Sequence, residues 1–288
     1  MVSHWWKNPN NINNLLNAAE VLDGQYPDAQ IVAVGQSAAW IVYALGELRS
    51  LKGRSADTQI LAFTGHFMAE ETRNHRLGER SEYSVDSKLY PHKSAFQSYF
   101  NYLADEHMSP AQVSQRYQKS GQKTVFVDMV VSGEGFASFM HTWFMALSKA
   151  PASARHGFVW EALAFHIYDW REQSPTHFAI EMEHEDTLIV PLMRAEGDGI
   201  DVTLSISNGQ GESDVTAESE RLAPAFDISA EGSGVLKYAD NEERVKAIIA
   251  IIQQAAIDRL AAQAPAATCT NQYPVTVFAR QNISARRP

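Results

Sequence analysis

The sequence predicts an α/β protein with a doubly wound, mainly parallel sheet, followed by a C-terminal α+β elaboration. Short apolar runs that end in glycine or aspartate alternate with helical patterns over residues 1–150, which is typical of a parallel sheet covered by helices on both faces. After residue 150 this alternation weakens, and strand-like runs follow one another. We therefore expect an α/β core over 1–150 and a hood or accessory region over 151–288.

The predicted core begins with a helix over 10–22, where apolar residues recur at helical spacing. The run AQIVAVG (29–35) has the apolar character of a buried parallel strand. A helix over 37–51 follows, with Ser37 as its expected N-cap. TQILAFTG (58–65) repeats the pattern of a strand that ends in glycine.

The next stretch, 65–92, is polar and without periodicity, which indicates a functional loop, a lid or a hairpin. Helices are expected over 93–105 and 109–118. A strand from Thr124 to about Asp128 then leads through a glycine-containing turn into a helix over about 135–147.

The C-terminal part carries a less regular pattern. The run 158–170 fits a buried helix or a strand, and both readings stay open. The other expected elements are strands at 177–182 and 187–193, a hairpin around 201–207, an amphipathic helix over 241–263 capped by Asp240 or Asn241, and one strand within 273–288.

Composition limits the classes of function. The formal net charge of −10 argues against general nucleic-acid binding, because phosphate neutralisation needs a surplus of Lys and Arg. Cys269 is the single cysteine, which rules out an intramolecular disulfide framework. The chain shows no apolar leader and no run of about 18 apolar residues. We expect a cytoplasmic protein without a membrane partner. A homodimer is compatible with the sequence.

Two strand-to-helix turns are candidates for ligand binding. Ligands of parallel sheets bind where strands end and helices begin, so the turns after Gly35 and Asp128 are expected at one sheet edge. At the first turn, a glycine followed by a helix N-terminus can hold an anion. At the second, the Asp128 carboxylate can accept hydrogen bonds from sugar hydroxyls beside a small-residue anion cradle. The expected ligand-binding residues are Gly35, Gln36, Ser37, Asp128, Val131, Ser132, Gly133, Glu134 and Gly135.

The segment VFVDMVVSGEGF resembles the ribose-phosphate-binding signature of type I phosphoribosyltransferases. An apolar run, Asp128 at the first acidic position and the small turn residues Ser132 and Gly133 carry the resemblance, which covers roughly residues 28–148. VAVGQSAAW is similar to the upstream pyrophosphate-binding loop of that family, and 65–92 stands where the family has its flexible catalytic loop. The resemblance implies transfer of a pentosyl group between pyrophosphate and a nitrogenous base, with Mg²⁺.

Within this family reading, Asp128, Arg73 and Arg76 are the expected catalytic residues, the two arginines as loop cations for departing pyrophosphate. Met129 stands at the second acidic position of the signature, and Glu134 stands where a small residue is usual. These departures favour a divergent subfamily or a fold kept for another purpose. The alternatives are a non-catalytic nucleotide-binding regulatory or interaction module on the same fold, and an unrelated hydrolase or transferase.

Two further clusters have weaker patterns. His177, Glu181, Glu183 and His184 lie close in sequence, but their spacing matches no zinc motif, and no metal is expected there. Trp160 and Trp170 lie in the region expected to cover the site, where either could stack on a base.

Overall fold

The computed structural model describes residues 5–36, 38–63, 93–130, 160–166, 176–185, 188–198, 224–229 and 233–263, together with Phe139, Thr142, Trp143, Ala146, Arg221 and Leu222. Expected elements at 65–92, 201–207 and 273–288 lie outside these residues. Of the helix expected over 135–147, the four described residues are helical.

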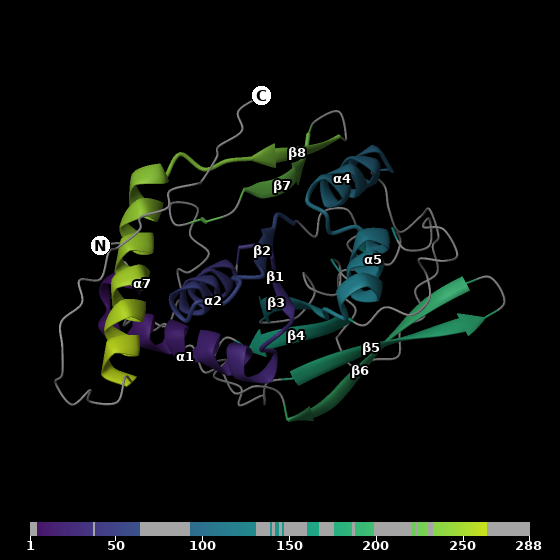
Figure 1. Cartoon of the computed structure of the whole chain (residues 1–288). Coiled ribbons are helices and arrows are strands. Elements are labelled where there is room, and N and C mark those ends of the chain that lie inside the picture. Colours follow the sequence, from purple (N-terminus) through teal and green to yellow (C-terminus); the bar gives the residue numbers. More distant parts are fainter. Residues whose placement is uncertain are drawn as a thin grey trace.

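Six strands form one sheet in the order β2-β1-β3-β4-β5-β6 (Figure 1). The first four of these neighbours pair in parallel, and β5 and β6 add antiparallel strands. The fold is thus mixed α/β, with a parallel part that continues into an antiparallel one. The strands are β1 (Gln30–Val34), β2 (Thr58–Leu61), β3 (Thr124–Val130), β4 (Trp160–His166), β5 (Thr176–Glu185) and β6 (Leu188–Asp198).

The pairing settles two points that the sequence left open or placed differently. Part of the run 158–170 is a strand, because β4 pairs in parallel with β3 over its whole length. β3 continues two residues beyond Asp128, so Asp128 lies inside the strand and does not end it. The sheet also crosses residue 150, and the division of the chain there stays a prediction.

Helices cover both faces of the sheet. In Figure 1, α1, α2 and α7 lie on one side of the parallel strands, and α4 and α5 lie on the other. The helical segments are η1 (Trp5–Lys7), α1 (Pro9–Gln25), α2 (Ala39–Leu51), α4 (Lys93–Asp105), α5 (Pro110–Ser120) and α7 (Glu242–Gln263). None of the described helices is both long and apolar enough to cross a membrane.

The helix ends follow local chemistry at most positions. Asn8 caps α1 by accepting a hydrogen bond from the Asn10 amide at 3.0 Å. The Ser109 amide donates to Oε1 of Gln112 at 3.1 Å, as in a capping box. The prediction that Ser37 is the N-cap of α2 was wrong. The N-cap is Ala38, one residue later, and its side chain cannot cap the helix.

The α1–α2–α7 face of the sheet packs on a buried cluster of mainly aliphatic side chains, which also contains Trp5 and Trp40. Val125 and Val127 of β3 belong to one buried cluster with residues of these helices, and α7 contributes Ile248 and Ile252. Because strand side chains alternate, Phe126 points to the opposite face. Burying each such aliphatic side chain contributes on the order of 1.5–3 kcal/mol.

The α4–α5 face of the sheet packs on aromatic rings. Phe126 lies 5.2 Å from Phe139 and 5.3 Å from Trp143 between ring centroids. The indole nitrogen of Trp143 donates to the Met108 carbonyl at 2.9 Å, which satisfies the polar group of a fully buried ring.

A hairpin that the sequence reasoning missed lies against α4. It consists of β7 (Ala225–Ile228) and β8 (Gly234–Lys237), and Phe226 is buried against Tyr99 with a centroid distance of 4.8 Å. A Cβ added at Gly234 would come within 2.2 Å of the Phe226 ring, so this position needs glycine. Two short apolar runs around a Gly/Ser turn were the available signal.

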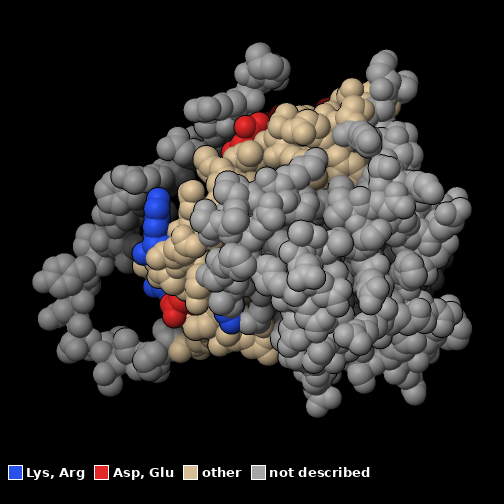
Figure 2. Space-filling view, turned by 90° about the vertical axis from the view of Figure 1, so that its right-hand side faces the viewer, with Lys and Arg blue, Asp and Glu red and all other residues tan. Residues whose placement is uncertain are grey.

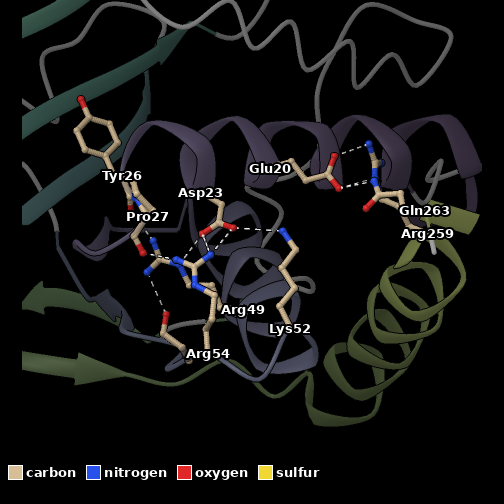
Figure 3. Close-up of polar contacts among 10 residues, drawn as sticks. Glu20, Asp23, Tyr26, Pro27, Arg49, Lys52, Arg54, Arg259 and Gln263 are labelled. Carbon is tan, nitrogen blue, oxygen red and sulfur yellow. Dashed lines mark hydrogen bonds and ion pairs between the residues drawn. The ribbon is translucent and has the colours of Figure 1, made fainter. Parts of the chain in front are cut away.

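The amino ends of β1 and β2 are held by a buried arginine (Figure 3). Arg49 of α2 is 1% exposed and donates from Nε to Asp23 of α1 at 3.0 Å. Its other nitrogens donate to the carbonyls of Tyr26 at 2.6 Å, Ala29 at 2.9 Å and Ala56 at 3.3 Å. One side chain therefore joins α1, the segment before β1 and the segment before β2.

Asp23 is surrounded by three cations. Besides Arg49, Lys52 approaches at 3.2 Å and Arg54 at 2.7 Å (Figure 3). Burial by itself would raise the pKa of the Asp23 carboxyl, but the hydrogen bonds from the three cations and the charge of Arg54 outweigh it and lower the pKa below its ordinary 3.8. The carboxylate form of Asp23 is therefore stabilised in the folded protein.

Asp23→Asn is expected to lower the free energy of unfolding at pH 7 by about 3 kcal/mol, because it leaves a buried arginine without its counter-charge. Glu20→Gln is the control on the same helix. Glu20 pairs with Arg259 at 2.8 Å but is a quarter exposed, so its loss is expected to cost less than about 1 kcal/mol. Urea unfolding followed by circular dichroism measures both variants.

The wild type and the Asp23→Asn variant also test how the free energy of unfolding depends on pH. A lowered pKa in the folded state means that the Asp23 carboxylate stabilises the fold above about pH 4, and that this contribution is lost as the pH falls through the folded pKa. The difference in stability between wild type and Asp23→Asn should therefore shrink below about pH 4. A difference that stays constant between pH 7 and pH 3 would contradict this account.

Candidate functional site

The candidate site lies at the carboxyl edge of the parallel strands, opposite the Arg49 network. β1 ends at Val34, and Gly35 follows with a φ of +68°. β3 lies beside β1, and their register runs up to Ala33 opposite Val127, directly before Asp128. Gly35, directly after β1, and Asp128, on the neighbouring β3, therefore lie at the same edge, as the sequence predicted.

The turn at Gly35 depends on backbone freedom. A Cβ at this position would meet no atom within 4 Å, so the positive φ, and not lack of space, is what favours glycine. The Gly35 amide donates to the Leu61 carbonyl of β2 at 2.8 Å, and the Gln36 carbonyl accepts from the Ala39 amide at 3.1 Å. The turn thus links β2 to the first turn of α2.

Asp128 lies on the aromatic face of the sheet. Side chains alternate along β3, so Asp128 shares the face of Phe126 and is opposite to that of Val127. Asp128 is 8% exposed, and its strand neighbour on the far side is Ala164 of β4. The carboxylate therefore belongs to the α4–α5 side of the edge and stands two residues before the end of β3.

A tyrosine clamp, made of Tyr99 and Tyr102 of α4, holds the end of β2. The Tyr99 hydroxyl donates to the Ala62 carbonyl at 3.0 Å, and the Ala62 amide donates to the Tyr102 hydroxyl at 2.8 Å. Burial raises the pKa of both phenols above the ordinary value, so both stay neutral. The phenols therefore fix the chain where it leaves β2, at the edge that carries Gly35.

No local sequence pattern predicts this clamp. The sequence predicted only a helix over 93–105 here, because nothing local marks a phenol that will meet a backbone group from 37 residues earlier. Phe63 packs at 5.6 Å from Tyr99 and at 5.3 Å from Phe139 between centroids, and so extends the aromatic packing to this edge.

The structure brings together three of the predicted site residues, Gly35, Gln36 and Asp128. The other predicted residues lie outside the described part of the chain, namely Ser37, Arg73, Arg76, Val131, Ser132, Gly133, Glu134 and Gly135. Trp160 opens β4, and Trp170 is outside the described part. Among the described residues, no group of three or more His, Cys, Asp or Glu side chains is placed to hold a metal ion.

Among the described residues on the side shown in Figure 2, few Lys, Arg, Asp or Glu side chains are drawn. The Lys, Arg, Asp and Glu side chains that are drawn there stand near the margins of the described surface. Arg49, Lys52 and Arg54 gather instead around Asp23 at the amino edge of the sheet. These charges therefore serve the scaffold.

Comparison with known proteins found no match: no protein-family model, no curated protein and no solved structure is similar to this chain.

Tyr99→Phe is expected to lower the free energy of unfolding by about 1–3 kcal/mol, because it leaves the buried Ala62 carbonyl without its donor. Tyr102→Phe removes the acceptor of the Ala62 amide and should cost a similar amount. Tyr238→Phe is the control: Tyr238 is 76% exposed, and its change should stay within about 0.5 kcal/mol. Urea unfolding measures the three variants, and equal stabilities would contradict the clamp.

Proposed function

We propose that the protein binds a phosphorylated ribose ligand at the carboxyl edge between β1 and β3, and that it transfers a pentosyl group to or from a nitrogenous base on a phosphoribosyltransferase-like, doubly wound fold. The observation that carries this proposal is the strand order β2-β1-β3-β4 with all four strands parallel. The chain leaves β1 toward β2 on one side and later returns to β3 on the other. In sheets of this kind, ligands bind outside the carboxyl ends at that reversal.

The described residues at this reversal suit a phosphate and a sugar. Gly35 lets the backbone approach a ligand closely, and α2 begins four residues later without a side-chain cap. A helix N-terminus in this position can hold an anion. On the neighbouring strand, the Asp128 carboxylate can accept hydrogen bonds from ribose hydroxyls.

In the proposed reaction, the bond from ribose C1 to pyrophosphate breaks as a bond from C1 to a base nitrogen forms. The positive charge that develops at C1 calls for positioning and electrostatic stabilisation more than for covalent chemistry on the protein. Asp128 would position the ribose. Arg73 and Arg76 are proposed to stabilise the departing pyrophosphate.

The expected Mg²⁺ fits this site only in part. Asp128 is the one carboxylate that the described residues place at the β1–β3 edge, and Met129 follows it where the family signature has a second acidic residue. Mg²⁺ is commonly held by one or two carboxylates together with substrate phosphates. We therefore propose that magnesium enters bound to the phosphates of the ligand, with Asp128 as the protein's contribution.

A second candidate function is a non-catalytic nucleotide-binding module on the same fold. Met129 favours it, because the missing carboxylate weakens the hold on a magnesium-bound pyrophosphate. In this version the β1–β3 edge binds the ribose phosphate, and no pyrophosphate is released.

Asp128→Asn is expected to weaken binding of phosphoribosyl pyrophosphate in the presence of Mg²⁺ by about 10- to 100-fold, the effect of losing hydrogen bonds to a charged acceptor. Isothermal titration calorimetry measures the affinity. Asp258→Asn on α7 is the matched control and should bind like wild type, because Asp258 is exposed and contacts Gln254 of its own helix.

The possible results separate the two versions. Binding that depends on Asp128 and is accompanied by pyrophosphate release with a suitable base supports the transferase. Binding that depends on Asp128 without release, across purine and pyrimidine bases, supports the module. Absence of any heat at millimolar ligand would overturn both.

A further inference from the structure

β2 is the terminal strand of the sheet, so its outer edge faces away from β1. The Ile31 amide donates to Asp57, and the Gly35 amide donates to Leu61, at 2.9 and 2.8 Å. In a parallel pair the backbone groups of alternate residues face the same neighbour. Residues 57, 59 and 61 therefore face β1, and the amides and carbonyls of Thr58 and Ile60 face outward.

One end of this outer edge is closed by the tyrosine clamp, and the remainder is open. Ala62 has the same parity as Thr58 and Ile60, and its outward amide and carbonyl are bound by Tyr102 and Tyr99. Within the described part of the chain, the backbone groups of Thr58 and Ile60 have no such partner. Exposed edge groups of this kind are templates for another strand.

A groove of about 310 Å³ runs beside these open groups, between β2 and α2. Its lining is more apolar than polar. Gly46 packs so closely against Thr58 that an added Cβ would lie 2.7 Å from the threonine hydroxyl oxygen. The residues that shape it are Val42, Tyr43, Gly46 and Glu47 of α2 and Thr58 and Ile60 of β2.

Among the described residues that line this groove, one has an acidic side chain, Glu47 of α2. Gln253 of α7 donates to Oε1 of Glu47 and to the Tyr43 hydroxyl, each at 3.1 Å, and so orients both at the groove wall. Burial, followed by the hydrogen bond to Glu47, raises the pKa of Tyr43, so the phenol is neutral. The groove therefore presents a carboxylate within a mainly apolar lining, which matches a lysine or arginine side chain with its apolar stem and cationic head.

We propose that the outer edge of β2 accepts an extended, basic peptide segment of another protein as an additional strand, with one basic side chain of that segment in the groove beside Glu47. The backbone groups of Thr58 and Ile60 supply the pairing, and the groove supplies selection for the side chain. A second copy of this chain fits less well. Antiparallel pairing of two β2 strands about a twofold axis would set the two α2 helices, and the two Glu47 carboxylates, along the same seam.

The test uses a fluorescein-labelled six-residue peptide of alternating lysine and valine, and fluorescence anisotropy with the full chain. Saturable binding is expected. It should weaken by about tenfold or more when alternate peptide nitrogens are methylated, because methylation keeps the charge and removes the backbone donors. Glu47→Gln should weaken it about threefold to fivefold, the size of one partly exposed ion pair.

Two α2 variants give a matched steric control. Ser50 lines the groove and is exposed, so Ser50→Trp should fill the groove and weaken peptide binding by about tenfold or more without disturbing the fold. Leu51, the next residue, is 44% exposed and does not line the groove, so Leu51→Trp should leave peptide binding unchanged.

Three results would overturn the proposal. The first is no saturable binding up to millimolar peptide. The second is equal binding of the methylated and unmethylated peptides, since adhesion to an acidic protein would then account for it. The third is a dimer in sedimentation velocity that Ser50→Trp dissociates and Leu51→Trp does not, because the occupant of the edge would then be a second copy.

Discussion

The buried Arg49 guanidinium is the interaction on which the parallel sheet depends. It joins α1 through Asp23 and holds the carbonyls of the segments that lead into β1 and β2. A guanidinium carries five donors in a rigid planar fork, so it can hold acceptors from several segments in fixed directions, whereas an ammonium has three donors on a flexible stem. Because the amino ends of the two strands are fixed in this way, their carboxyl ends emerge at defined positions on the opposite edge.

The opposite edge is held by neutral groups. Tyr99 and Tyr102 bind the Ala62 backbone, and Phe63 packs among neighbouring rings, so the exit from β2 is rigid without any ion pair. Within the described part of the chain, this arrangement leaves the electrostatic character of the carboxyl edge to Asp128 and to the Gly35 turn. An anionic ligand at that edge would meet backbone amides and a carboxylate suited to sugar hydroxyls.

The terminal strand β2 takes part in both proposed sites. Its inner edge pairs with β1 and supplies the Leu61 carbonyl to the Gly35 turn, and its outer edge presents Thr58 and Ile60 beside the α2 groove. α2 likewise has its first turn at the Gly35 edge and its middle turns along the groove. A peptide bound at the groove would therefore contact the same two elements that build the ligand edge.

Sequence by itself determined the elements and their order, since apolar periodicity and glycine turns mark β1, α2, β2 and β3, and their alternation predicts parallel pairing. It also predicted that Gly35 and Asp128 meet at one edge, because this follows from topology. Tertiary structure decided three further points. β4 is a strand, Arg49 pairs with Asp23, and two tyrosines of α4 form hydrogen bonds with the Ala62 backbone. These contacts join residues 26 or more positions apart, and no local pattern encodes which distant partner a polar side chain will meet.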